Sequence, residues 1–421
     1  MLDEPIAVRA SGIEPDEEVT VEVAMDWNEA TFTSHATFAA DDEGTVDTGR
    51  DAPVSGTYEG VDRMGLFWSM TPEGDVGSTR EAGHVPARLL TEFTLVRAGD
   101  VADKVEIVRR SRPTGVSRRS IEAADLPADL YLPPGDGPHP GVVVLGGSEG
   151  GKPGRTLPWL LAARGYAVLG PAYFGVEGAP AETLAEVPVE VVEGAVDWFG
   201  ERPEVQRAPV AVLGHSRGSE LAFLLAGRLD RVRCAIGVAP SGVAFEGLTK
   251  RYRNAGTSAW SVADTPYAYV PVEFSLSDLA SNAWSMVKGE PVEVRGSYLG
   301  GIDEADPETV ADAELPVEFT GGPICLVAGE DDRVWDAATL ARRIRDRLAD
   351  ADYEYQVDCR TYPDAGHALS VPYLPTTDRA VKGRGRLKLA MGGTPAGYAA
   401  ADEDAWQAIL QTLQAISGGS A

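Results

Sequence analysis

The pentapeptide Gly214-His215-Ser216-Arg217-Gly218 places a serine between two glycines, where an apolar run meets a helix-like run. It fits G-x-S-x-G, the pattern of a sharp strand-to-helix turn that presents a nucleophilic hydroxyl. Glycines flank such a serine because the strained backbone brings neighbouring chain too close for side chains. The pattern alone also fits a tight turn with a solvated serine. The apolar segment 208–214 and the helix-like segment 219–229 favour Ser216 as a nucleophile.

A serine hydroxyl is a poor nucleophile unless a base accepts its proton, and the chain has five histidines that could be this base. His35 and His84 lie in a strand-rich N-terminal region, and His139 precedes the first long apolar strand. His215 adjoins the serine but faces elsewhere on a turn of this kind. His367, in a loop after a late strand, is therefore the predicted base; the alternative is an ordinary loop histidine.

The acid that orients the imidazole should follow the preceding strand of the core. Asp331 and Asp332 come directly after the apolar run 323–329, and their position does not separate them. Asp364 lies only three residues before His367, which is too close to approach the ring from behind. The chain order serine, aspartate, histidine is the order of α/β-hydrolases.

An oxyanion hole would complete this chemistry with backbone N–H groups that stabilise the negative oxygen of a tetrahedral intermediate. One expected donor is the N–H of Arg217, directly after the nucleophile. The other should come from the glycine-rich loop 146–151, where Ser148 N–H is our first choice and Gly147 N–H the next. A phosphate-binding loop is disfavoured, because this segment lacks the Gly-Lys-Ser/Thr spacing.

The first part of the chain, residues 1–112, reads as an all-β sandwich domain. Segments 18–25, 31–38 and 91–98 alternate polar and apolar residues, and clusters of Gly, Asp and Pro separate them. Short alternating strands with frequent turns are typical of such sandwiches.

Residues 113–421 follow a different pattern, in which apolar strands alternate with amphipathic helices. This pattern predicts an α/β domain with a mainly parallel sheet that helices cover on both faces. The expected strands are 142–145, 166–170, 210–213, 233–238, 323–330 and 355–362, and the expected helices are 156–164, 187–199, 219–228, 337–349 and 403–416. An aromatic-rich insertion at about 243–316 interrupts the rhythm. We interpret it as a lid or pocket wall, and the alternative is a surface excursion without function.

Composition narrows the classes of partner. The net charge is −28, with six Lys against 31 Arg, which disfavours nucleic-acid binding. No apolar run is long enough to span a membrane, and the acidic residues 1–5 do not resemble a signal peptide. The three scattered cysteines show no metal spacing or disulfide framework, so we expect a cytoplasmic protein without a metal. The acidic, lysine-poor composition fits either a salt-rich cytoplasm or a GC-rich genome.

Taken together, these residues resemble the acyl-CoA thioesterase and bile acid-CoA:amino acid N-acyltransferase family over nearly the whole chain. The resemblance rests on several quoted stretches rather than on one motif: DEPIAVRASGIEPDEEVTVEV, GTYEGVDRMGLFWSMTP with Met-Gly-Leu-x-Trp at 64–68, LYLPPGDGPHPGVVVLGG, GYAVLGPAYFG, GGPICLVAGEDDRVW, YPDAGHAL and AMGGTPAGYAAADEDAWQAILQTL. It implies that the nucleophile is Ser216, the base His367 and the acid Asp332, the second aspartate of GEDD. The resemblance implies an α/β-hydrolase fold for the second domain.

The resemblance also implies an activity: hydrolysis of acyl-CoA to free fatty acid and CoA through an acyl-serine, as a step of lipid metabolism. No cofactor is expected beyond the CoA of the substrate. The amino-acid-conjugating branch of the family has cysteine as nucleophile, and the thioesterases have serine as here, so Ser216 favours hydrolysis. The alternatives are an acyl-CoA:amino acid N-acyltransferase, a dienelactone-hydrolase-like ester or lactone hydrolase, and a non-catalytic binding protein of the same fold.

Four further charged residues lie near the expected site. Arg155, Arg217 and Arg333 lie on loops expected around the site, where they would form a positive mouth for the phosphates of CoA, or else ordinary surface ion pairs. Glu220 lies on the first turn of the helix after the serine, and we expect it to form a structural pair with a nearby arginine.

Overall fold

The computed structural model describes residues 1–27, 30–74, 85–154, 156–250, 253–384 and 387–417. The first part forms an antiparallel β domain, which confirms the all-β expectation. Its main sheet has the order β5-β3-β2-β7-β8, β6 pairs with β3, and β1 and β4 form a separate pair. The elements are β1 (Arg9–Ser11), β2 (Glu18–Trp27), β3 (Ala30–Ala39), β4 (Thr45–Asp47), β5 (Ser55–Gly56), α1 (Gly65–Trp68), β6 (Thr71–Pro72), β7 (Arg88–Arg97) and β8 (Asp100–Arg110).

The second part is built on a sheet of order β21-β20-β15-β14-β11-β12-β10-β9. The neighbours from β12 to β21 pair in parallel, and β10 is antiparallel to both β12 and β9. The expected mainly parallel sheet is therefore confirmed. Its strands are β9 (Ser117–Ala123), β10 (Leu126–Leu132), β11 (His139–Leu145), β12 (Ala167–Pro171), β14 (Val205–His215), β15 (Val232–Val238), β20 (Ile324–Gly329) and β21 (Val357–Tyr362).

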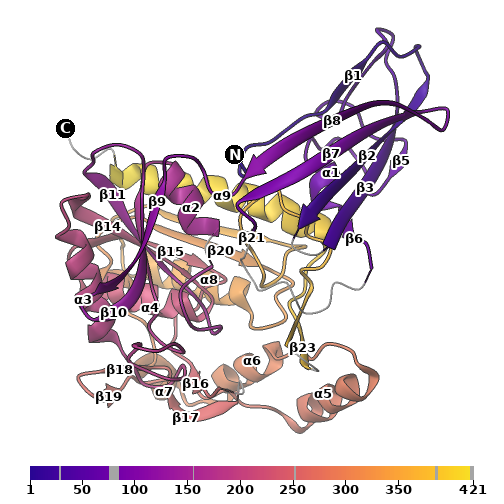
Figure 1. Cartoon of the computed structure of the whole chain (residues 1–421). Coiled ribbons are helices and arrows are strands. Elements are labelled where there is room, and N and C mark those ends of the chain that lie inside the picture. Colours follow the sequence, from indigo (N-terminus) through magenta and orange to yellow (C-terminus); the bar gives the residue numbers. More distant parts are fainter. Residues whose placement is uncertain (28–29, 75–84, 155, 251–252, 385–386, 418–421) are drawn as a thin grey trace.

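Helices cover both faces of this sheet, as Figure 1 shows. The helices are α2 (Thr156–Ala163), α3 (Val189–Gly200), α4 (Arg217–Arg228), α8 (Ala337–Asp350) and α9 (Pro395–Ser417). Successive side chains of a strand point to opposite faces. In β11, Val143 and Leu145 join the core beneath α3, α4 and α8. Val142 and Val144 join a second core beneath α2 and α9. This second core continues into the N-terminal domain.

Helix α9 begins earlier than the sequence pattern predicted. We expected a helix over 403–416, and the structure begins it at Pro395. Proline suits the first turn of a helix, because its fixed φ is helical and its missing N–H would have no partner there. The segment 395–402 contains mostly alanine and glycine, so it carries little apolar periodicity to reveal a helix.

The chain between β15 and β20 leaves the sheet and forms a layer of small elements, seen at the bottom of Figure 1. It contains β16 (Glu246–Leu248), β17 (Asn254–Ser258), β18 (Trp260–Val262), β19 (Thr265–Pro266), α5 (Leu276–Lys288), α6 (Arg295–Glu304), α7 (Pro307–Asp312) and η2 (Val317–Phe319). The strand β13 (Val187–Pro188) pairs with β18, and the hairpin of β22 (Val381–Arg384) and β23 (Leu387–Ala390) reaches the same layer through the bridge Val292–Leu389.

A buried arginine joins the two domains. Arg109, on β8, donates from Nη1 to Tyr373 O at 2.7 Å and from Nη2 to Leu2 O at 2.5 Å. Its guanidinium lies 4.4 Å from the centre of the Phe67 ring. Burial lowers the pKa of Arg109 to about 10, so the group stays charged at neutral pH. The loop that contains Tyr373 follows His367, and Thr376 N in this loop donates to the N-terminal domain at Trp68 O, at 3.0 Å.

We predict that Arg109→Ala lowers the free energy of unfolding by about 2–4 kcal/mol, because it leaves buried carbonyls without a donor and removes packing on Phe67. Urea unfolding followed by tryptophan fluorescence measures the effect. The matched control is Arg110→Ala, which removes an exposed side chain next to it and should change stability by less than about 0.5 kcal/mol. Equal losses in the two variants would contradict a special role for Arg109.

Candidate active site

Ser216 lies on a strained turn between β14 and α4. Its φ of 53° and ψ of −124° place a non-glycine residue in a rarely occupied backbone region. A Cβ on Gly214 would stand 2.0 Å from Gly218 O, and a Cβ on Gly218 would stand 2.3 Å from Gly146 O. Both glycines are therefore required by close backbone approach, as the sequence pattern predicted.

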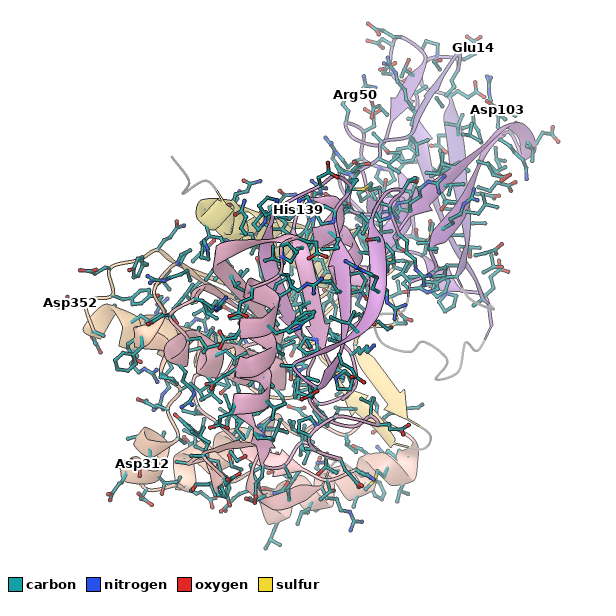
Figure 2. All side chains as sticks on the ribbon, turned by 60° about the vertical axis from the view of Figure 1, so that its left-hand side comes forward. Glu14, Arg50, Asp103, His139, Asp312 and Asp352 are labelled. Atoms are coloured by element: carbon teal, nitrogen blue, oxygen red, sulfur yellow. The ribbon has the colours of Figure 1, made fainter. Side chains whose placement is uncertain are left out.

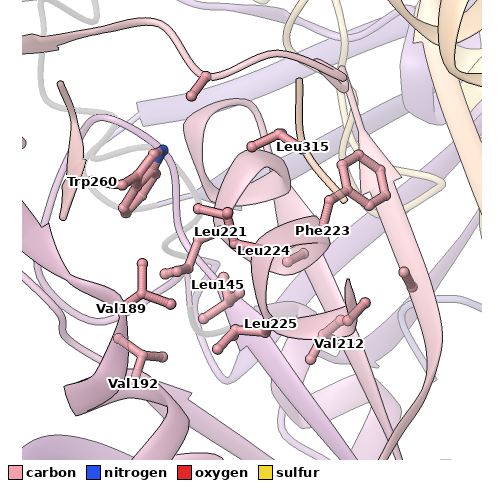
Figure 3. Close-up of a cluster of buried hydrophobic side chains, with 14 of the residues drawn as sticks. Leu145, Val189, Val192, Val212, Leu221, Phe223, Leu224, Leu225, Trp260 and Leu315 are labelled. Atoms are coloured by element: carbon pink, nitrogen blue, oxygen red, sulfur yellow. The ribbon is translucent and has the colours of Figure 1, made fainter. Parts of the chain in front are cut away.

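Helix α4 is anchored beneath this turn by apolar packing. Its Leu221, Leu224 and Leu225 lie in one buried cluster with Val189 of α3 and Leu145 of β11 (Figure 3). The helix is buried over most of its length, so the position of its N-terminus relative to the sheet is fixed. This packing therefore positions Ser216 through its backbone, independently of the contacts that its side chain makes.

The structure brings together the three side chains that the sequence selected. His367 Nε2 lies 2.9 Å from Ser216 Oγ, and His367 Nδ1 lies 2.7 Å from Asp332 Oδ2. Because a carboxylate only accepts hydrogen bonds, Nδ1 carries a proton and Nε2 is free to accept one from the serine. Ser216 and His367 are each 5% exposed, and Asp332 is fully buried. The arrangement is that of a nucleophile, a general base and an orienting acid.

The two neighbouring aspartates have different surroundings. Asp332 Oδ1 accepts the N–H groups of Val334 and Trp335 at 2.8 and 3.1 Å, which leaves Oδ2 for the imidazole. Asp331 instead pairs with Arg333 at 2.5 Å and accepts Gly393 N–H at 2.9 Å. The geometry therefore separates two residues that position along the chain left open, and it agrees with the assignment that the family resemblance gave.

Further contacts hold His367 that the sequence analysis missed. Its N–H donates to Met391 O at 2.8 Å, and His215 Nε2 donates to its carbonyl at 3.2 Å. The Trp335 ring lies edge-on to the imidazole, with centroids 5.8 Å apart. His215 was set aside only as a base, and its place beside Ser216 was a usable signal for a supporting role. Nothing in the sequence indicated Met391, which is 24 residues downstream.

The expected oxyanion donors lie at the N-terminus of α4 and in the loop after β11. Within the described residues, no hydrogen-bond acceptor is found for the N–H of Arg217 or of Ser148. Gly147 N–H donates to Glu149 Oε1 at 3.1 Å. A Cβ on Gly147 would stand 3.4 Å from Ser216 Cβ, so this glycine passes directly beside the nucleophile.

The arginines expected at a positive mouth are placed differently. The Arg217 side chain is only 1% exposed, and its Nη1 lies 2.9 Å from Oε1 of the buried Glu220. Arg333 lies between Asp331 and Glu293. Arg155 lies outside the described residues. The expectation of a positive mouth is wrong for Arg217 and Arg333, because both guanidinium groups are already paired with carboxylates.

Arg217 and Glu220 connect the turn to the insertion. Arg217 Nη2 donates to Phe245 O and Glu246 O at 2.9 and 2.8 Å, and Trp260 Nε1 donates to Glu220 Oε2 at 2.7 Å. Burial raises the pKa of Glu220 to about 7, against the lowering effects of Arg217 and Trp260. The structural pair expected for Glu220 is thus found, and its partner is the residue after the nucleophile.

Aromatic side chains from the insertion close the region around the imidazole. Phe245 and Tyr298 pack against each other and against Trp335, with ring centroids 4.9 to 5.8 Å apart. Together with the 5% exposure of Ser216, this makes the candidate site enclosed rather than open. Within the described residues, no His/Cys/Asp/Glu group arranged for a metal is found, and none of the helices is long and apolar enough to cross a membrane.

A serine on a strand-to-helix turn, with an acid and a histidine after later strands of a mainly parallel sheet, defines an α/β-hydrolase fold. Comparison with protein families identifies the group within that fold. Residues 187–417 match the model described as "BAAT / Acyl-CoA thioester hydrolase C terminal", and residues 3–123 match "Acyl-CoA thioester hydrolase/BAAT N-terminal region". The chain belongs to this family of acyl-CoA thioester hydrolases.

Individual relatives span nearly the whole chain. Human acyl-coenzyme A thioesterase 1 is 29% identical over 428 aligned positions, covering 99% of this chain and 94% of its own. The mouse peroxisomal succinyl-coenzyme A thioesterase is 27% identical, covering 97% and 92%. Among solved structures, a putative dienelactone hydrolase from Klebsiella pneumoniae is similar with a TM-score of 0.40 and 17% identity, over 71% of this chain and 98% of that one.

We predict that Asp332→Asn lowers kcat by about 10³- to 10⁴-fold, because an amide cannot hold the required imidazole tautomer or stabilise its charged form. Steady-state kinetics on an acyl-CoA, with circular dichroism to verify folding, measures the loss. The matched control is Asp331→Asn, which changes a carboxylate that contacts Arg333 and Gly393 but not the imidazole. A larger loss in the Asp331 variant would overturn the assignment of the acid.

Proposed function

We propose that this protein hydrolyses acyl-CoA thioesters to a free carboxylic acid and CoA through a Ser216–His367–Asp332 triad. The observation that carries the proposal is the pair of short contacts that join the three side chains, 2.9 Å from Ser216 Oγ to His367 Nε2 and 2.7 Å from His367 Nδ1 to Asp332 Oδ2. Membership in the acyl-CoA thioester hydrolase family supports the choice of a thioester as substrate.

In the first half of the proposed reaction, His367 Nε2 accepts the proton of Ser216 as its oxygen attacks the thioester carbonyl. Backbone N–H groups beside the serine stabilise the oxyanion, and Asp332 stabilises the imidazolium. The tetrahedral intermediate then collapses. The C–S bond breaks, His367 returns the proton to the departing sulfur, and CoA leaves as a thiol. The acyl group remains on Ser216 as an oxygen ester.

In the second half, His367 removes a proton from water, which attacks the carbonyl carbon of the acyl-serine. The C–O bond to Ser216 breaks, His367 returns the proton to Ser216 Oγ, and the acid is released. The chemistry of the nucleophile favours water as acceptor. An acyl-cysteine is a thioester and passes its acyl group readily to an amine, whereas an acyl-serine is an oxygen ester and does so less readily. Ser216 therefore supports hydrolysis over transfer to an amino acid.

The proposal is tested with acyl-CoAs of short, medium and long chain, with and without glycine or taurine, by measuring free thiol and acyl products. We expect thiol and free acid in equal amounts, and Ser216→Ala should abolish both because no other hydroxyl contacts His367 Nε2 among the described residues. Ser277→Ala, on the exposed face of α5, is the control and should retain full activity.

Other products would decide between the alternatives. Amide formation would identify an N-acyltransferase. Cleavage of p-nitrophenyl esters without thiol release from any acyl-CoA would identify an ester hydrolase. Undiminished thiol release by the Ser216 variant would exclude the proposed nucleophile.

We also propose that the acidic surface is adapted to high salt in a cytoplasmic protein. The net charge is −28, and exposed acids such as Asp103, Asp312 and Asp352 project from distant parts of the molecule (Figure 2). Molar KCl screens repulsion among such groups beyond a few ångströms. We predict a higher midpoint temperature of unfolding in molar than in millimolar KCl, measured by calorimetry beside a protein of near-zero net charge. An unchanged or lower midpoint would contradict this adaptation.

A further inference from the structure

The loop after β11 carries a carboxylate that the proposed reaction does not use. Glu149 turns back on its own loop, so that Oε1 accepts the N–H of Gly147 at 3.1 Å. A Cβ on Gly147 would meet Glu149 Oε2 at 2.9 Å and Ser216 Cβ at 3.4 Å. The carboxylate and the nucleophile therefore approach the same point from two sides.

A buried tyrosine fixes the direction of the Gly147 N–H. The hydroxyl of Tyr173, which is 1% exposed, donates a hydrogen bond to Gly146 O. The C=O and N–H of one trans peptide point in opposite directions, so a carbonyl held by Tyr173 turns Gly147 N–H away from the core. On that side stand the Glu149 carboxylate and the approach to Ser216.

A carboxylate oxygen bound by a backbone N–H resembles the oxyanion of a tetrahedral intermediate in charge and in hydrogen bonding. A carbonyl attacked by Ser216 needs donors at this same edge of the serine. The N-terminus of α4 supplies Arg217 N–H. Gly147 lies on the other side, where a Cβ would stand 3.4 Å from Ser216 Cβ, so its N–H is a donor close to the nucleophile. The carboxylate and the oxyanion would compete for it.

We propose that Glu149 is a gate of the oxyanion hole: its carboxylate accepts the hydrogen bond of Gly147 N–H, and the substrate carbonyl must displace it before Ser216 reacts. The inference rests on the proposed function in taking Ser216 as the nucleophile. Glu149 is exposed on its outer side, so it can swing into solvent without disturbing the core. It would also oppose a negative charge developing beside it unless it moved away.

The gate is tested with a neutral alkyl fluorophosphonate, which phosphonylates an activated serine with loss of fluoride and needs the same donors for its P=O oxygen. We expect the second-order rate constant for labelling of Ser216 to rise about two- to tenfold in Glu149→Ala and to rise less in Glu149→Gln, whose amide oxygen can still accept the N–H of Gly147. This range corresponds to releasing one hydrogen bond at a partly exposed site. Stopped-flow or gel-based labelling of the full chain measures the rate, and mass spectrometry locates the label.

The control is Glu177→Gln, which removes an exposed carboxylate from a nearby loop without touching Gly147 and should leave the rate unchanged. A slower or unchanged rate in Glu149→Ala would overturn the gate, since a supporting or neutral side chain gives those results. An equal rise in the Glu177 variant would also overturn it, because the effect would then be net charge alone.

The result of the labelling test can be distinguished from the result of the acyl-CoA assay that tests the proposed function. Labelling reports on Ser216 and its donors, and it requires no acyl-CoA. Faster labelling in the Glu149 variants together with no thiol release from acyl-CoAs would support the gate and reject the thioesterase. Thiol release that depends on Ser216, without faster labelling in these variants, would support the thioesterase and reject the gate.

Discussion

The close approach of three backbone segments around Ser216 is the constraint on which the rest of the structure depends. Gly218 passes so near the carbonyl of Gly146 that a Cβ would stand 2.3 Å from its oxygen. The N-terminus of α4 therefore lies directly against the loop after β11, and Ser216 at this terminus has a φ of 53°. The nucleophile, Arg217 N–H and the Gly146–Gly147 peptide are thereby brought to one place by backbone packing alone.

A second set of hydrogen bonds positions the imidazole of His367 beside Ser216. Asp332 is fully buried, and its two oxygens are divided between backbone N–H groups and His367. A buried carboxylate is costly unless it is fully hydrogen-bonded, so this carboxylate has little freedom to reorient. The backbone of His367 is held in turn by Met391 and His215. The acid and the histidine are therefore both held by contacts on the side away from Ser216.

The insertion and the N-terminal domain both connect to this frame. Arg217 and Glu220 bind the insertion to the first turn of α4 through Phe245, Glu246 and Trp260. The N-terminal domain reaches the loop after His367 through Arg109 and Trp68. The first attachment involves the residue after the nucleophile, and the second involves the loop that follows the histidine. In the proposed gate, Glu149 in the loop after β11 moves when a substrate carbonyl enters the site.

Much of this was determined by the sequence itself. Apolar strands alternating with amphipathic helices specified the α/β sheet, because each element must bury one face or both. The G-x-S-x-G turn selected Ser216, and elimination among five histidines selected His367. The structure brings these two side chains together, with 2.9 Å between Ser216 Oγ and His367 Nε2. The strand-to-helix turn is a local pattern, and the order of serine, acid and histidine along the chain can be read directly from the sequence. The early start of α9 was not predicted, because residues 395–402 include four alanines and Tyr398 is their one large apolar side chain, which gives only a weak apolar periodicity.

Only the tertiary structure determined in which direction each of the site's side chains points. Asp331 and Asp332 are adjacent and chemically identical. The backbone N–H groups of Val334 and Trp335 bind one oxygen of Asp332 and leave its other oxygen for the imidazole. Arg217 was expected to face solvent, and the fold buried it against Glu220. The hydrogen bond from Gly147 to Glu149 likewise follows from how the loop closes. Sequence fixes which groups exist and their order along the chain, whereas contacts between distant segments fix where each group points.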